Sequence, residues 1–344
     1  MPPAPRVPSF AVIPGADVHR VLDGRHGEVV RLVESAYRVH GGGDTVNPPS
    51  CFLRFPDRPD SRIIALPASL GGPAPLDGIK WISSFPRNVA AGLPRASAVL
   101  VLNDPVTGYP LACMESSIIS AARTAASAVL AADRLTRGRE RPRRIGFFGT
   151  GLIARFIHQY LARTGWSFTE TGVYDLSAEH ARGFAGHLGR EGDNGTLTLH
   201  SDPGELIRSS DLVVFATVAP APHVTDPGWF THNPLVLHVS LRDLSPEVIL
   251  TAANIVDDID HCLRAGTSPH LAEQATGNRD FIAGTLYDVL TGTLDVPHGR
   301  PVVFSPFGLG VLDLALGGHV YDTLHARGEL AVVDGFFHET RRYG

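Results

Sequence analysis

A short apolar strand, followed directly by a glycine-rich turn and an amphipathic helix, is the feature that most constrains this chain. Residues 144–148 have the length and composition of a buried strand, and Gly149-Thr150-Gly151-Leu152-Ile153-Ala154 follows them in a G-x-G-x-x-A pattern. Gly149 can adopt the dihedral angles of a tight turn, Gly151 lets a ligand approach the backbone, and Ala154 lets the helix pack closely on the sheet. The helix N-terminus presents free N–H groups to phosphate oxygens. The pattern therefore predicts a dinucleotide-binding turn, in which the cofactor-binding residues are Gly149, Thr150, Gly151, Leu152 and Ile153.

An acidic residue ends the next expected strand. Asp175 lies 24 positions after Gly151, where a carboxylate accepts hydrogen bonds from the adenosine ribose hydroxyls and repels a 2′-phosphate. This placement favours NAD over NADP as the cofactor. A second interpretation stays open, because Asp175 also precedes Ser177-Ala178-Glu179 and could cap a helix there without any cofactor.

Length and composition narrow the class of protein. A chain of 344 residues with 43% hydrophobic residues predicts two domains with a large core. The net charge is −5 and the basic residues are scattered, which argues against a nucleic-acid partner. The segment Met1 to Arg6 lacks the pattern of a signal peptide, and no apolar run reaches membrane-spanning length. Cys51, Cys113 and Cys262 are far apart and read as reduced thiols, so we expect a cytoplasmic protein without a membrane partner.

The first part of the chain does not alternate strands and helices. A helix is expected from Glu28 to His40, and an Ala-rich helix from Ser116 to Leu135. Between them lie short apolar runs separated by Pro and Gly, which indicate an antiparallel or mixed sheet. These runs are Cys51 to Phe55, Arg62 to Leu66, Ile79 to Ile82, Ala98 to Leu102 and Leu111 to Met114.

From residue 143 the pattern alternates strands and helices, which predicts a parallel, doubly wound sheet. Further strands are expected at 196–200, 212–217, 235–240 and 255–256, with helix starts at Pro203 and Pro246. Ligands of such sheets bind beyond the carboxyl ends of the strands. Three further residues at such ends are predicted to bind the cofactor, namely Thr217, Val218 and Ser240.

The C-terminal part changes character again. One more strand is expected at 302–305, and a helix starting near Gly308 should return to the first domain. The nucleotide-binding module would then be inserted into a discontinuous domain. We expect the first domain to comprise residues 1–125 plus 311–344, and the nucleotide-binding domain residues 126–310.

Four basic residues of the first domain are candidates for binding carboxylates. Arg54 and Lys80 lie within apolar runs, Arg123 lies in the Ala-rich helix, and Arg87 follows the third run. A charge in such surroundings is costly unless it is paired, and Arg binds carboxylates through two parallel hydrogen bonds. Internal ion pairs with Asp or Glu explain the same pattern, so both interpretations stay open.

An acid–base residue is expected near the end of the 235–240 strand. Asp243 lies just beyond this strand, where a carboxylate could act as a general base. A turn or capping role ahead of Ser245-Pro246-Glu247 is the alternative. His238 and His261 could also exchange protons, although an isolated His on a strand is usually a satisfied core residue. No Cys/His cluster indicates a metal.

Several separated motifs, in order along nearly the whole chain, resemble the ornithine cyclodeaminase/mu-crystallin family. They are Gly78-Ile79-Lys80, Ser83 to Asn88, Gly92-Leu93-Pro94, Leu102-Asn103-Asp104 with Thr107-Gly108, Arg123-Thr124-Ala125-Ala126, the glycine-rich turn, and Phe307 to Gly310 with Asp313. The resemblance implies an α/β fold in which a Rossmann domain with a doubly wound parallel sheet is inserted into an α+β substrate-binding and dimerisation domain. It also implies a homodimer, carboxylate binding by Arg54, Lys80 and Arg123, and acid–base catalysis by Asp243, with a catalytic role open for Lys80.

Within this family, three segments are similar to the branch of 2,3-diaminopropionate biosynthesis, the N-(2-amino-2-carboxyethyl)-L-glutamate dehydrogenases. They are Leu53 to Pro56, Lys80 to Asn88, and Ser240-Leu241-Arg242-Asp243. Ornithine cyclodeaminases tend to have Gly-rich residues before the catalytic Asp, where this chain has Leu241 and Arg242. The branch substrate carries three carboxylates, which a pocket with Arg54, Lys80, Arg87 and Arg123 suits, whereas such a pocket repels the distal ammonium of ornithine.

The resemblance to this branch implies a reaction. NAD takes a hydride from the glutamate Cα, the amine becomes an imine, and Asp243 accepts the amine proton and activates water. Hydrolysis releases 2-oxoglutarate and L-2,3-diaminopropionate, for a siderophore or a nonribosomal peptide antibiotic. The alternatives are an ornithine cyclodeaminase, another amino-acid or imine dehydrogenase of the family, or a mu-crystallin-like protein that binds a nicotinamide cofactor without turnover.

Overall fold

The computed structural model describes residues 7–191, 195–297 and 299–340. The segment Met1 to Arg6, for which the sequence predicts no signal peptide, lies outside the described residues. The chain divides into two compact units: unit 1 comprises Met1–Arg123 and Leu309–Gly344, and unit 2 comprises Thr124–Gly308. Unit 2 is thus inserted into unit 1, and both boundaries fall two residues before the positions expected from the sequence.

Unit 1 combines strands from its N-terminal part with a helix from its C-terminal part. Its elements are β1 (Ala11–Ile13), α1 (Gly15–Leu22), α2 (His26–Gly41), β2 (Thr45–Val46), β3 (Cys51–Phe55), β4 (Arg58–Leu70), β5 (Leu76–Ser84), the 3-10 helix η1 (Pro86–Ala91), β6 (Ala96–Asn103), β7 (Pro110–Glu115), the start of α3 (Ser117–Leu135) and α11 (Gly310–Ala326). The strands described form a seven-stranded sheet in the order β1-β7-β6-β5-β4-β2, with β3 paired to β4. Only β1 and β7 run parallel in it, so the expected mixed sheet is confirmed.

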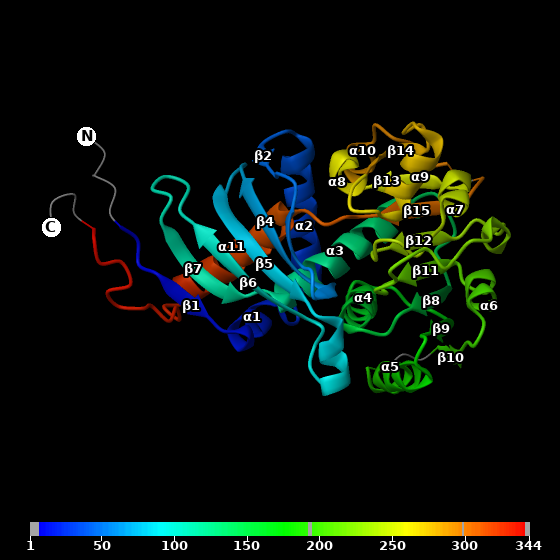
Figure 1. Cartoon of the computed structure of the whole chain (residues 1–344), viewed down its shortest axis with the longest axis horizontal. Coiled ribbons are helices and arrows are strands. Elements are labelled where there is room, and N and C mark those ends of the chain that lie inside the picture. The colour runs from blue at the N-terminus through cyan, green and yellow to red at the C-terminus, as the bar shows by residue number, and fades with distance from the viewer. Residues whose placement is uncertain (1–6, 192–194, 298, 341–344) are drawn as a thin grey trace. The chain divides into compact units, whose positions relative to one another are not determined.

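The core of unit 1 lies between this sheet and α11, which Figure 1 shows behind β4, β5 and β6. Residues on alternate positions of β6 are buried on this face, as Leu100 and Leu102 show. Two glycines allow the close approach of helix and sheet, because a Cβ on Gly317 would lie 2.3 Å from Leu100 and a Cβ on Gly78 would lie 2.8 Å from Leu314. A side chain of β5 that points to this face is therefore enclosed between β5 and α11.

Unit 2 is built around one parallel sheet. Its elements are the rest of α3, β8 (Arg144–Phe148), α4 (Leu152–Arg163), β9 (Glu170–Tyr174), α5 (Ala178–Arg190), β10 (Thr196–Leu199), α6 (Pro203–Arg208), β11 (Leu212–Phe215), η2 (Pro227–Phe230), β12 (Leu235–His238), α7 (Pro246–Thr251), β13 (Ala253–Val256), α8 (Ile259–Cys262), α9 (Ser268–Thr276), β14 (Ile282–Thr285), α10 (Leu286–Thr291) and β15 (Val302–Ser305). Among these, eight strands pair in the order β10-β9-β8-β11-β12-β15-β13-β14, and every pair is parallel. The predicted doubly wound sheet is confirmed.

The strand order places the carboxyl ends of β8 and β11 side by side at the point where the winding reverses. From β8 the chain first adds β9 and β10 on one side, and then adds β11 and β12 on the other (Figure 1). Ligands of open α/β sheets bind in the crevice at this switch point. The cofactor-binding residues predicted in unit 2, and Asp243, follow the ends of β8, β9, β11 and β12, so they share one edge of the sheet.

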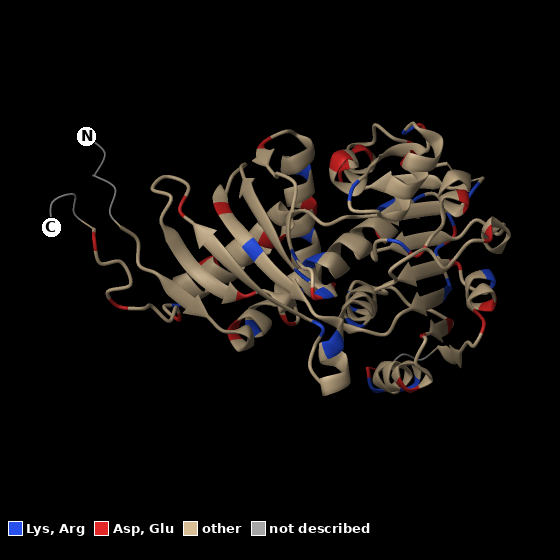
Figure 2. Ribbon diagram, viewed as in Figure 1, with Lys and Arg blue, Asp and Glu red and all other residues tan. Residues whose placement is uncertain are grey.

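Figure 2 shows basic and acidic residues interspersed along the ribbons of both units, without a stripe of one sign in this view. No helix in the described part of the chain is long and apolar enough to cross a membrane. The sequence did not predict β1, α1, β2 or the segment α8–α10.

Candidate active site

The glycine-rich turn has the geometry that its sequence predicts. Gly149 has φ of +81°, and a Cβ there would lie 2.7 Å from the carbonyl oxygen of Ala216, so only glycine fits. Gly151 is the N-cap residue of α4, without a side-chain cap, and a Cβ built on it meets nothing within 4 Å. The first turn of α4, which contains Leu152 and Ile153, thus faces open space with its N–H groups available. This is the arrangement that binds a pyrophosphate.

Asp175 closes the same edge of the sheet from β9. Its carboxylate accepts a hydrogen bond from the Thr150 hydroxyl at 2.7 Å and from the backbone N–H of Ser177 at 2.9 Å. The capping interpretation of Asp175 is wrong, because the N-cap of α5 is Ser177, whose hydroxyl accepts the N–H of His180. Asp175 instead links the glycine-rich turn to the end of β9.

Asp243 lies beyond β12 and has no exposed surface. Its Oδ1 accepts hydrogen bonds from the Thr217 hydroxyl and from Nε2 of His223, and its Oδ2 accepts one from the Ser240 hydroxyl. Nε2 of His238 lies 3.3 Å from Oδ2 and accepts the backbone N–H of Asp243 at the same distance. Burial alone would raise the pKa of Asp243, but the interactions with His223, His238 and Ser240 hold that pKa well below its usual range. Asp243 does not cap the following helix, which was the alternative prediction, because the N-cap residue of α7 is Ser245.

The other residues predicted for the carboxyl edge of the unit 2 sheet differ in burial and in hydrogen-bond partners. Thr217 and Ser240, predicted to bind the cofactor, both donate their hydroxyl hydrogens to Asp243. Val218 follows Thr217 and is 64% exposed. His238 is a satisfied core residue, as expected for a strand position, but one of its partners is Asp243 and the other is the Ser305 hydroxyl at 3.0 Å. His261 lies in α8, with its ring edge against Phe307.

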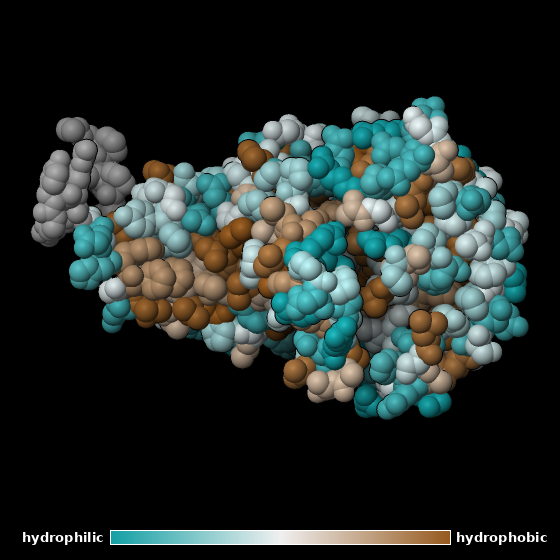
Figure 3. Space-filling view, in the orientation of Figure 1, coloured by the Kyte–Doolittle hydropathy of each residue, from teal (hydrophilic) through white to brown (hydrophobic). Residues whose placement is uncertain are grey.

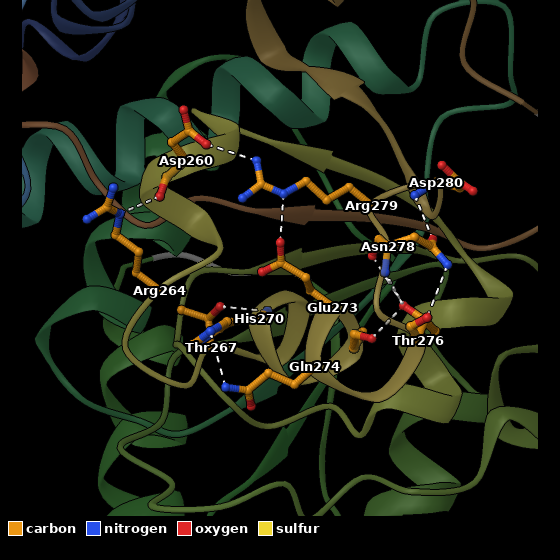
Figure 4. Close-up of polar contacts among 11 residues, drawn as sticks. Asp260, Arg264, Thr267, His270, Glu273, Gln274, Thr276, Asn278, Arg279 and Asp280 are labelled. Carbon is orange, nitrogen blue, oxygen red and sulfur yellow. Dashed lines mark hydrogen bonds and ion pairs between the residues drawn. The ribbon is translucent and has the colours of Figure 1, made fainter.

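The loop that carries Asp243 is fixed from the side of α9. The N–H of Ser268 donates to the carbonyl of Leu241 at 2.8 Å, and Nη2 of Arg242 donates to the carbonyl of Ala265 at 2.8 Å. Polar contacts stabilise the segment around α9 (Figure 4). Arg279 donates hydrogen bonds to Glu273 at 2.6 Å and to Asp260 at 2.9 Å, and the Thr267 hydroxyl caps the N-terminus of α9. These hydrogen bonds therefore hold the loop of Asp243 in place.

In unit 1, a buried ionic cluster joins β5, α3 and α11. Nζ of Lys80 lies 2.6 Å from Oδ2 of Asp313 and 3.5 Å from the Ser120 hydroxyl. Nε of Arg123 donates to Oδ1 of the same Asp313 at 3.3 Å. Lys80 is 2% exposed, Asp313 is fully buried and the Arg123 side chain is 12% exposed. Two of the four predicted carboxylate-binding residues are thus brought together on one internal carboxylate.

This cluster carries an excess positive charge. The charged groups that act on Lys80 are Asp313 and Arg123, so two cations share one anion. Burial lowers the pKa of Lys80 to about 8; Asp313 opposes this lowering and Arg123 adds to it. The two terminal nitrogens of Arg123 have no hydrogen-bond partner among the described residues. A buried net charge of this kind is stabilised by a further anion, such as a ligand carboxylate.

Arg54 and Arg87 have surroundings that differ from the prediction. Arg54 is exposed, and its guanidinium lies 5.0 Å from the centre of the Phe52 ring. It is not enclosed in an apolar environment, because β3 pairs only with β4. Arg87 is 77% exposed and pairs with Asp60 at 3.1 Å. Neither residue makes a hydrogen bond or an ion pair with the buried cluster of Lys80.

Two residues of these networks were not assigned a role from the sequence. Asp313 could have been found, because a lone carboxylate in the apolar stretch 310–316 is the same signal that singled out Arg123. His223 follows Pro220-Ala221-Pro222 in a loop, where no local pattern marks it. In the described ranges no group of three His, Cys, Asp or Glu side chains has the geometry of a metal site.

Comparison with known proteins relates the whole chain to a group of enzymes. An N-((2S)-2-amino-2-carboxyethyl)-L-glutamate dehydrogenase of Staphylococcus aureus is 29% identical over 312 residues, which is 87% of this chain and 90% of the relative. An alanine dehydrogenase of Archaeoglobus fulgidus is 28% identical over 302 residues, with 86% and 89% of the two chains covered.

A solved structure shares the fold. The Delta(1)-pyrroline-2-carboxylate reductase of Thermococcus litoralis superposes with a TM-score of 0.85 at 22% identity, covering 94% of this chain and 99% of the other. The family model for ornithine cyclodeaminase/mu-crystallin proteins matches residues 17–328, which takes in both units. The chain therefore belongs to the ornithine cyclodeaminase/mu-crystallin family.

Proposed function

We propose that this protein is an NAD-dependent oxidoreductase that acts on a carbon–nitrogen bond of an amino acid. More specifically, we propose that it oxidises and hydrolyses N-((2S)-2-amino-2-carboxyethyl)-L-glutamate to L-2,3-diaminopropionate and 2-oxoglutarate, for siderophore or nonribosomal peptide biosynthesis. The observation that carries this proposal is the buried cluster of Lys80, Arg123 and Asp313 with its excess positive charge. The 29% identity to a dehydrogenase of that name supports the choice of substrate.

The residues at the edge of the unit 2 sheet fit NAD. Gly149 and Gly151 leave the room that a pyrophosphate needs, and the uncapped N-terminus of α4 supplies N–H donors. Asp175 keeps acceptor capacity for ribose hydroxyls and is unsuited to a 2′-phosphate. When bound, NAD supplies the hydride acceptor of the reaction. Leu152, Ile153, Thr217, Val218 and Ser240 are proposed to complete its surroundings.

The roles of the chain's own residues follow from their charge. Lys80 and Arg123 bind a substrate carboxylate, which neutralises their excess charge and fixes the orientation of the Cα–N bond. Arg54 and Arg87 stay predictions for the other two carboxylates. The Asp243 network carries the acid–base work: it takes the amine proton as the C=N bond forms, and later a proton from the water that attacks the imine carbon. Collapse of the adduct then breaks the C–N bond and releases the two products.

We also propose a homodimer formed through the open face of the unit 1 sheet. On the face away from α11, Val12, Trp81 and Val99 are 47%, 42% and 40% exposed, and Trp81 and Val99 are cross-strand partners. Figure 3 shows the apolar side chains gathered over this sheet. An apolar patch of this extent on a folded protein marks an interface. Light scattering should give twice the chain mass, and Val99→Asp should give the mass of one chain.

The test of the reaction uses the purified protein, NAD and the synthetic substrate. NADH is followed by absorbance and the products by mass spectrometry, with ornithine and alanine as parallel substrates. NADH together with 2-oxoglutarate and 2,3-diaminopropionate is the expected result. Proline from ornithine, or turnover of alanine alone, would assign the chain to another reaction of the family.

A matched pair of variants tests the carboxylate site. Arg123→Ala should lower kcat/KM by an amount equivalent to about 1.5–3 kcal/mol, which is the contribution of hydrogen bonds to a charged group. Most of this change should appear as a higher KM. Arg141, which stacks on Trp166 in unit 2 at 4.1 Å, provides the control: Arg141→Ala should leave KM unchanged. Equal kinetics of the two variants would return Arg123 to a purely structural role.

A further inference from the structure

The carboxylate of Asp243 is enclosed by its hydrogen-bond partners and does not reach the surface. An ionised carboxylate offers about four lone-pair sites on its two oxygens. In this structure Thr217 and His223 donate to Oδ1 and Ser240 donates to Oδ2, while Nε2 of His238 lies 3.3 Å from Oδ2 and also accepts the backbone N–H of Asp243. Asp243 also has no exposed surface. A group that exchanges a proton with a ligand must be another member of this network.

His223 is the titratable member of the network that reaches the surface. Its side chain is 36% exposed, whereas Asp243 and His238 are fully buried. His238 uses both ring nitrogens inside the protein, one on Ser305 and one on Asp243. His223 is held beside Asp243 by the backbone as well, because its N–H donates to the Asp243 carbonyl at 3.0 Å. The rings of His223 and Phe215 are in an edge-to-face contact, with their centroids 6.5 Å apart.

The contact with Asp243 fixes the tautomer of His223. Nε2 lies 3.0 Å from Oδ1, and because a carboxylate only accepts, Nε2 carries the hydrogen. Nδ1 then keeps its lone pair, and no described residue donates to it or accepts from it. An imidazole oriented by a buried carboxylate, with the lone pair of its other nitrogen directed away from that carboxylate, is the arrangement of a general base.

We propose that His223 is the catalytic base of the proposed reaction and that Asp243 is the positioning residue that orients it. This inference rests on the proposed function and names the atom, Nδ1 of His223, that moves the protons. As the hydride leaves the substrate Cα for NAD, Nδ1 takes the amine proton and the C=N bond forms. His223 returns this proton to the imine nitrogen, and Nδ1 then takes a proton from water as its oxygen bonds to carbon.

The final step restores the base. The C–N bond breaks as His223 gives its proton to the departing nitrogen, and the hydroxyl proton of the adduct passes to solvent as the carbonyl forms. The sum is amine, water and NAD⁺ giving ketone, primary amine, NADH and one proton. The low pKa of Asp243 agrees with its orienting role, because a strongly stabilised carboxylate is a weak base.

The test compares His223→Gln with a matched control. The glutamine amide can still donate to Asp243 but cannot take a proton, so kcat should fall by roughly 10²–10⁴ while the Kd for NAD and the KM change less than about threefold. The control is His232→Gln: His232 bonds the carbonyl of Ser210 at 2.8 Å, near the amino ends of the strands, and this variant should keep its kcat. Combining His223→Gln with Asp243→Asn should lower kcat little further, because the two residues act as one unit.

A measurement without substrate addresses the tautomer. Nitrogen-15 NMR of the rings should show His223 with the proton on Nε2, and Asp243→Asn should abolish this preference. The proton on Nδ1, or a His223→Gln variant with kcat within threefold of the unchanged protein, would overturn the inference while leaving the proposed function intact. If ornithine or alanine is the substrate that turns over, the variants are compared on that substrate. No turnover by the unchanged protein on any of the three would refute the proposed function together with this role.

Discussion

Replacing Lys80 by methionine should leave the fold as stable as before or make it more stable, although it removes a buried ion pair. The pKa of Lys80 falls from 10.5 to about 8 on burial, so keeping this side chain protonated inside unit 1 at pH 7 destabilises the fold by roughly 3 kcal/mol. Methionine has a similar length without the charge, and Asp313 keeps Arg123 as its partner. We therefore expect Lys80→Met to change the free energy of unfolding by between zero and about +3 kcal/mol.

Urea unfolding at pH 7, with an unchanged dependence on denaturant, measures this difference. The same variant should lose substrate binding, with a catalytic efficiency lower by about 10- to 150-fold. A decrease in the free energy of unfolding by more than about 1 kcal/mol would refute the reasoning, because attraction to Asp313 would then outweigh the cost of burying the charge.

The pH dependence provides a second check on Lys80. Between pH 8 and about 10.5 the unfolded chain binds more protons at this residue than the folded chain, since the folded pKa is the lower one. The free energy of unfolding should therefore gain a contribution from Lys80 as the pH rises through this window, and Lys80→Met should lack that contribution.

Four further variants have expected outcomes. Asp313→Asn leaves two buried cations without a counter-ion, so the urea-derived free energy of unfolding should fall by about 3–5 kcal/mol, opposite in sign to the Lys80 variant. Asp175→Ser should raise the affinity for NADP relative to NAD by about tenfold or more in fluorescence titrations; an unchanged ratio would remove Asp175 from cofactor selection. Gly149→Ala should lower the free energy of unfolding by about 1–3 kcal/mol, because its φ is positive and its Cβ would press on Ala216. Gly183→Ala, in open space on α5, should instead raise it by about 0.4–1 kcal/mol.

The elements that the sequence predicts best are those defined by local patterns. Residues 144–154 specify strand, turn and helix through apolar composition, glycine placement and helical spacing, and β8 and α4 appear where expected. The Ala-rich stretch gives α3 within one residue of the expected start at Ser116. In contrast, β14 has the sequence Ile-Ala-Gly-Thr, which is too short and too weakly apolar to predict, and only its pairing with β13 makes it a strand.

The partners within the candidate site could not be predicted, because they depend on tertiary contacts between distant positions. Lys80 and Asp313 are 233 positions apart, and the sequence marks each as a charge in apolar surroundings without linking them. Arg54 has the same local signal as Lys80, yet it is exposed, since β3 pairs only with β4 and is not enclosed by α11. Local composition therefore identifies candidate charges but not which of them are buried.

The two buried carboxylates show why burial by itself assigns no role. Asp243 accepts hydrogen bonds from Thr217, Ser240 and His223, a histidine that reaches the surface, so its charge orients the groups around it. Asp313 has two cationic partners, and its single charge leaves one of theirs uncompensated. The first arrangement holds a proton carrier in place, whereas the second attracts an anion. An amino-acid oxidation needs both, because the substrate carboxylate must be anchored while the amine loses its proton.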